Sequence, residues 1–128
     1  MMNISFALTT EQVRNRSKTV TRRIGWKTLK PGALLQPVLK AQGIPKGGTV
    51  TKVGGPIRVV SVRRERLDLI TDAECVLEGF PTMRAAEFVE MFGRTHRVRG
   101  ESPFAKHHTF TRPVRGTDTI TRIEFEYV

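Results

Sequence analysis

Hydrophobic and polar residues alternate along several short stretches of the chain. The alternation is clearest in residues 4–8, 33–39, 57–62 and 119–128. A period of two places successive side chains on opposite faces of an extended backbone, so these four stretches are predicted to be strands. Residues 57–62 are the best of them, because they are rich in β-branched valine and isoleucine.

Three stretches carry helix signals instead. A short helix is predicted over residues 10–16, after a hydroxyl cap. Thr71 and Glu74 form a capping-box pattern that opens a second helix, and Gly79 is expected to stop it in a left-handed conformation. A third helix is predicted over residues 84–93, where phenylalanine and methionine recur at helical spacing.

The order of these elements indicates the fold class. Strands and short helices do not alternate in the way that a doubly wound parallel sheet requires. We therefore expect an α+β protein: a small mixed or antiparallel β-barrel covered by two to three short helices. The 128 residues suit a single domain, residues 1–128, with long loops near residues 40–56 and 97–117.

Charge is distributed very unevenly. The net charge is +10, and residues 12–64 contain 13 Lys or Arg side chains but no Asp or Glu. This stretch accounts for the whole excess and predicts a basic surface that attracts a polyanion, such as RNA or a nucleotide. A generic solubilising surface and a surface for an acidic protein partner are the alternatives.

Other classes of chemistry find little support. Cys75 is the only cysteine, and adjacent histidines such as His107 and its neighbour seldom point at one ion, so we expect no metal and no cofactor. No apolar run has the length of a membrane span, and the first residues lack a signal-peptide pattern. A cytoplasmic protein with no membrane partner is the expectation, and the pattern leaves its oligomeric state open.

The most informative stretch is residues 16–23, which follows the short helix. If this stretch is extended, Thr21 and Arg23 share a face, and a bend after the helix would bring Lys18 to join them. An ammonium, a hydroxyl and a guanidinium together suit a phosphate or the oxygen of a nucleobase.

Here the chain resembles the ASCH family, a group within the PUA-like superfamily of β-barrels. Its signature is Gly-x-Lys-x-x-Thr-x-Arg, and Lys18, Thr21 and Arg23 fall on the last three named positions. Arg16 replaces the glycine, and Asn15 is expected to take the left-handed conformation in its place. Residues 29–32, the Glu-Gly-Phe ending of residues 69–80 and the Ile-x-Phe closing strand agree with the family in order. A small basic protein of this kind would suit a phage or prophage.

The resemblance implies two kinds of function. The first is an RNA- or nucleotide-binding module with a basic cleft around the Lys-x-x-Thr-x-Arg motif. The alternative is a hydrolase. In an N4-acetylcytidine amidohydrolase, the resemblance would make Thr21 the nucleophile, Lys18 its base and Glu78 the stabilising carboxylate, and some ASCH proteins are regarded as ribonucleases.

Further residues are candidates for contacts with nucleic acid. Trp26 lies among basic side chains, where a base could stack on it, although a tryptophan after a strand is more often part of a core. The predicted loop at residues 97–117 adds basic side chains that could contact phosphates. Together with Lys18, the predicted contacts are Arg22, Arg23, Trp26, Lys27, Lys106, His107 and Arg112.

Overall fold

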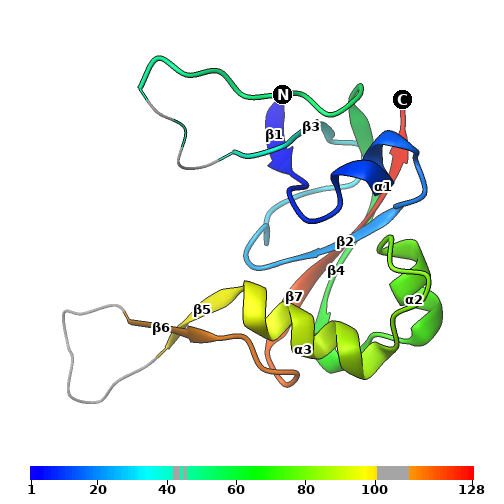
Figure 1. The fold of residues 1–128 in the computed structure, drawn as a ribbon, viewed down its shortest axis with the longest axis vertical. Coiled ribbons are helices and arrows are strands. Elements are labelled where there is room, and N and C mark those ends of the chain that lie inside the picture. The colour runs from blue at the N-terminus through cyan, green and yellow to red at the C-terminus, as the bar shows by residue number, and fades with distance from the viewer. Residues whose placement is uncertain (42–43, 45, 101–109) are drawn as a thin grey trace.

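A five-stranded mixed sheet forms the centre of the protein (Figure 1). The structure is a computed structural model that describes all residues except 42, 43, 45 and 101–109. The strand order is β1-β3-β4-β7-β2, in which only β1 and β3 are parallel. The strands are β1 (Met2–Ser5), β2 (Val20–Arg23), β3 (Leu34–Val38), β4 (Ile57–Arg66) and β7 (Thr119–Tyr127).

The α+β class and the mixed sheet agree with the sequence prediction, but the sheet is open. Strands β1 and β2 are its two edges, and in the described part of the chain they do not pair with each other. The barrel closure that was predicted is therefore not formed. Strands β3 and β7 are close to the predicted ones, whereas β4 continues four residues further, to Arg66. Strand β1 begins two residues before the predicted stretch 4–8 and ends three residues before its end.

Hydrophobic clusters cover the two faces of the sheet. In β7, Ile120 and Ile123 point to opposite faces because side chains alternate along a strand. A β-bulge between Val59 and Ser61 shifts the register of β4 against β7. One cluster contains Ile4, Phe6, Val13, Leu35, Val53, Ile57, Val59, Ile123 and Phe125, and the other contains Leu67, Ile70, Cys75, Phe88, Phe92, Val114 and Ile120.

Short helices flank the sheet, and three of them contribute residues to the second cluster. They are α1 (Thr10–Arg14), the 3₁₀ turn η1 (Leu67–Leu69), α2 (Asp72–Leu77) and α3 (Ala85–Thr95). The Thr71 hydroxyl accepts a hydrogen bond from the Glu74 amide at 3.2 Å, as predicted. The prediction that the Glu74 carboxylate would accept a bond from the Thr71 amide is wrong, because this carboxylate instead accepts two bonds from Arg122. Gly79 ends α2 with a φ of +98°, the predicted left-handed stop.

A two-stranded ribbon stands where a long loop was predicted at residues 97–117. Strand β5 (Arg97–Gly100) pairs with β6 (Phe110–Pro113) in antiparallel register. In Figure 1 the ribbon extends away from the sheet beyond the C-terminal end of α3. Each strand has only four residues, too few for a period to stand out in the sequence. Near residues 40–56, the described part contains no helix or named strand, only an isolated bridge between Val38 and Lys52.

Candidate functional site

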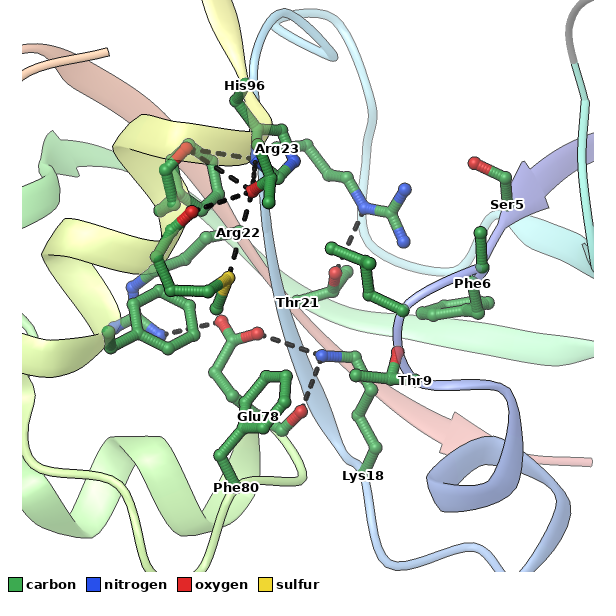
Figure 2. Close-up of a pocket in the computed structure, with 16 residues that line it drawn as sticks. Ser5, Phe6, Thr9, Lys18, Thr21, Arg22, Arg23, Glu78, Phe80 and His96 are labelled. Atoms are coloured by element: carbon green, nitrogen blue, oxygen red, sulfur yellow. Dashed lines mark hydrogen bonds and ion pairs between the residues drawn. The ribbon is translucent and has the colours of Figure 1, made fainter. Parts of the chain in front are cut away.

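Strand β2 carries the candidate site on the edge of the sheet. Its register against β7 places Thr21 and Arg23 on one face and Arg22 on the other. Since β2 has a neighbour on one side only, side chains from both of its faces can turn around its open edge. All three line the same pocket, which Figure 2 shows in close-up.

Lys18 lies just before β2 and is 2% exposed. Its Nζ donates to the main-chain oxygen of Glu78 at 2.7 Å and to Oε1 of the same residue at 2.8 Å. The backbone here is fixed from two directions: the Tyr127 hydroxyl donates to the Lys18 carbonyl, and the Thr19 amide donates to Leu77. The predicted convergence of Lys18 with Glu78 is therefore an intimate ion pair, formed across 60 residues of sequence.

The bend that delivers Lys18 is made by Arg16. Its φ is +62°, whereas Asn15 has an ordinary φ of −86°. The prediction that Asn15 would replace the signature glycine is wrong, because Arg16 itself takes the left-handed conformation. Its guanidinium lies 5.6 Å from the centre of the Tyr127 ring, within the range of a cation–π contact.

Arg22 extends the ion pair into a buried network. Its Nη1 donates to Glu78 Oε2 at 2.9 Å, and its Nη2 lies 3.3 Å from Glu65 and 3.9 Å from Glu74. The side chain of Arg22 is only 1% exposed, and its Nε has no partner among the described residues. Both oxygens of Glu78 are thus held by cations, which fixes the direction of its carboxylate.

Thr21 and Arg23 complete the polar floor. The Arg23 Nε donates to the Thr21 hydroxyl oxygen at 3.0 Å, which leaves the hydroxyl proton available to another acceptor. The Arg23 guanidinium also lies over the Phe6 ring, 4.8 Å from its centre. In Figure 2 this guanidinium points away from Glu78, toward Phe6 and Ser5.

Burial changes the acidity of both cations. Desolvation lowers the pKa of Lys18, and although the Glu78 carboxylate opposes this, Arg23 and Arg22 lower it further. Desolvation also lowers the pKa of Arg23 to about 10, again opposed by Glu78. Arg23 therefore stays charged at neutral pH, whereas Lys18 can lose its proton more easily than an ordinary lysine.

The walls of the pocket are apolar. The pocket has a volume of about 260 Å³ and lies between the loop after β1, strand β2, the end of α2 and one face of α3. This is near the lower limit of small-molecule pockets, roughly 300 Å³, and suits a ligand of modest size. The wall side chains are Phe6, Leu8, Phe80, Phe88, Met91 and Phe92.

His96 forms the rim next to the ribbon. Its ring stacks on Phe92 with the centroids 3.8 Å apart and the planes 3° from parallel. Desolvation lowers the pKa of His96, so it is mostly neutral at physiological pH. Sequence reasoning did not find these wall and rim residues, although the helical spacing of Phe88, Met91 and Phe92 marked the face of α3 that they share.

Other predicted contacts lie elsewhere. Trp26 packs against the first hydrophobic cluster. Among the described residues that line the pocket, neither Trp26 nor Lys27 is found, and Lys27 is exposed. Arg112 is engaged by Asp118 through two bonds of 2.8 and 2.7 Å. Lys106 and His107 lie outside the described residues.

The acid-free stretch of sequence is not an acid-free surface. Carboxylates from outside residues 12–64 fold onto it and pair with five of its basic side chains. These five are Arg14, Lys18, Arg22, Arg58 and Arg63. Glu78 thus neutralises part of the charge on the floor of the pocket, whereas Arg23 has no carboxylate partner among the described residues.

Two further observations concern the described residues. They contain no group of three or more His, Cys, Asp or Glu side chains placed to hold a metal ion. None of the helices in this part of the chain has the length and hydrophobicity to cross a bilayer.

Comparison with solved structures identifies the fold. The chain is similar to the crystal structure of an ASCH domain from Lactobacillus crispatus, with a TM-score of 0.57 and 12% sequence identity. The alignment covers 98% of this chain and 79% of the other. No protein-family model matches the sequence, and the search of curated proteins gave no match. The similarity supports the ASCH resemblance at the level of the fold.

Proposed function

We propose that the protein binds a nucleobase, as a nucleoside or as one residue of an RNA strand, in the pocket beside β2. The observation that carries this proposal is the composition of the pocket: a polar floor of Lys18, Thr21, Arg23 and Glu78 beneath phenylalanine and methionine walls. A flat ring with polar edges fits such a site, because its faces pack against apolar side chains while its edge forms hydrogen bonds.

The floor also predicts which bases bind. Lys18 and Arg23 donate, so they suit a ring carbonyl, and Glu78 accepts, so it suits an exocyclic amine. Each oxygen of Glu78 already accepts one bond but retains a second lone pair. Cytosine and guanine offer both a carbonyl and an amine, whereas uracil lacks the amine and adenine lacks the carbonyl. We expect cytosine or guanine to be preferred.

Titration calorimetry with the four ribonucleosides tests this function. Cytidine or guanosine should bind, and Arg23→Ala or Lys18→Ala should weaken binding by at least tenfold. Thr21→Val, which keeps the shape of the side chain, should weaken it less. Lys30→Ala, at an exposed lysine outside the pocket, is the control. Equal affinity in wild type and all pocket variants would overturn the assignment.

Hydrolysis of N4-acetylcytidine is the second candidate. The observation that favours it is the lowered pKa of Lys18 in a pocket shared with the Thr21 hydroxyl. In this reaction Lys18 would take the Thr21 proton as Oγ1 attacks the acetyl carbonyl, and would pass it to the departing N4 amine. Water would then hydrolyse the acetyl-threonine ester, releasing acetate and restoring the hydroxyl.

Acetate release separates this activity from binding alone. Wild type should release acetate from N4-acetylcytidine with a rate that rises with pH, because Lys18 acts in its neutral form. Thr21→Val should abolish release yet still bind the nucleoside. If the nucleoside binds and no acetate forms during long incubation, the protein is a binding module only. The ribonuclease alternative stays a prediction that RNA cleavage assays can test in parallel.

A further inference from the structure

The β5–β6 ribbon presents arginine side chains on one face. Arg97 and Arg99 are two residues apart in β5 and therefore point to the same side, as does Thr111, which pairs with Arg99. Arg97 donates from Nε to the Thr111 hydroxyl at 2.8 Å and from Nη2 to its carbonyl at 2.7 Å. Both arginines are exposed.

No carboxylate of the described residues pairs with Arg97 or Arg99. This distinguishes them from Arg112, which lies on the opposite face of the ribbon and is neutralised by Asp118. The two faces of one ribbon thus differ: one holds it to the body of the protein, and the other offers positive charge to solvent.

The ribbon begins at the rim of the pocket. His96 lines the pocket, and Arg97, the next residue, begins the ribbon. Figure 1 shows the ribbon leading outward from the end of α3. A nucleotide whose base occupied the pocket would leave its sugar and phosphates at the mouth, where the ribbon begins.

We propose that Arg97 and Arg99 bind the phosphate backbone of a single RNA strand from which one base enters the pocket. This inference rests on the proposed function and narrows it, since the ligand is a polynucleotide and not a free nucleoside. The two guanidiniums stem from positions about 6.6 Å apart along the strand. They can each take a phosphate through paired N–H donors.

The test compares a nucleoside with a short oligonucleotide that contains it, using wild type and an Arg97→Gln/Arg99→Gln variant. Oligonucleotide affinity should fall at least tenfold in the variant. The slope of log affinity against log salt should become shallower by about 1.4, the value for two phosphate contacts on a single strand. Nucleoside affinity should not change. An Arg97→Lys/Arg99→Lys variant should recover most of the salt slope.

A matched control removes the same charge from another region. Arg14→Gln/Arg58→Gln alters two exposed arginines, on α1 and at the start of β4. If this control weakens oligonucleotide binding as much as the ribbon variant does, general charge is responsible and the inference fails. Arg99→Gln alone leaves the bonds between Arg97 and Thr111 in place and should give half the change in slope, which guards against misfolding of the double variant.

Remaining outcomes distinguish the inference from its premise. Nucleoside binding with an unaltered oligonucleotide affinity and salt slope in the ribbon variant would overturn the inference and leave the proposed function standing. Failure of wild type to bind any nucleoside or oligonucleotide would overturn both. Competition by an acidic peptide as effective as that by RNA would assign the ribbon to a protein partner instead.

Discussion

The floor of the pocket and the β5–β6 ribbon use the same cation in opposite ways. Arg22 is 1% exposed in its side chain and lies among three carboxylates, the nearest at 2.9 Å. Arg99 is exposed on a thin ribbon, and no described carboxylate pairs with it. A buried cation of the first kind orients its neighbours, whereas an exposed cation of the second kind is available to a ligand.

This difference explains why net charge is a poor guide to where a polyanion binds. The basic excess belongs by sequence to residues 12–64, but five of the 13 cations in this stretch form salt bridges with carboxylates from outside it. The ribbon lies outside that stretch, and its Arg97 and Arg99 have no carboxylate partner among the described residues. Four measurements of stability can break or sharpen the comparison.

The largest effect is expected for Glu78→Ala. Removing this carboxylate leaves Lys18 buried without a counter-ion and takes one of the partners of Arg22. Breaking a buried pair costs about 3–5 kcal/mol in the free energy of unfolding, measured by urea denaturation. Glu126→Ala removes an exposed pair with Arg58 and should cost about 0–1 kcal/mol. Equal losses would show that burial does not distinguish the two kinds of pair.

Gly93→Ala should have the next largest effect, because α3 approaches the segment after β6 closely at this residue. A Cβ there would lie 2.7 Å from the Val114 carbonyl oxygen, so α3 would have to move away from the segment after β6. Overpacking should outweigh the gain in helix propensity and cost about 1–2 kcal/mol. Gly55→Ala, where the new methyl meets nothing within 4 Å, is the control. Thermal melting of both variants tests the prediction, which an unaltered Gly93→Ala protein would contradict.

A smaller effect is expected for Asp118→Asn, which loosens the anchored face of the ribbon. Arg112 lowers the pKa of Asp118 to about 2, below its ordinary value near 3.9. The pair therefore stabilises the folded protein above about pH 4, and this contribution is lost as the pH falls toward 2. Since the pair is partly solvated, the variant should lose about 1 kcal/mol at pH 7. Urea denaturation across this pH range should show the difference between variant and wild type shrinking, and a constant difference would contradict the assignment.

The smallest effect is expected for Arg97→Gln/Arg99→Gln. Exposed polar substitutions usually change stability by about 0.5 kcal/mol or less, even though Arg97 bonds to Thr111 here. The same variant should nevertheless lose at least tenfold in affinity for the oligonucleotide. A large loss of stability would mean that Arg97 and Arg99 hold the fold together. They would then not differ from the buried cations of the pocket floor.

Local patterns predicted much of the fold. Alternation located β3, β4 and β7, and the Thr71 cap with Gly79 fixed the bounds of α2 almost to the residue. These features depend on neighbours within a few positions, so the sequence displays them directly. The motif likewise placed Thr21 and Arg23 on one face of β2.

Contacts between residues that are distant in the sequence could not be predicted from local patterns. The Glu74 carboxylate binds Arg122, which is 48 residues away, and leaves the capping box half formed. The ribbon depends on pairing between strands that each have only four residues. In each case the structure depends on a partner that is distant in the sequence, and hydrophobic periodicity does not reveal such partners.

The attachment of Lys18 has a consequence for the order in which the protein folds. The ion pair of its side chain cannot form until Glu78, 60 residues later, is in place. The hydrogen bond to its carbonyl likewise requires Tyr127, 109 residues later. Contacts of such sequence separation form slowly, because the entropy of closing the intervening chain must be met first. During synthesis on the ribosome, the pocket should therefore be assembled only after β7 has emerged and docked, and ligand binding should be among the last properties the chain acquires.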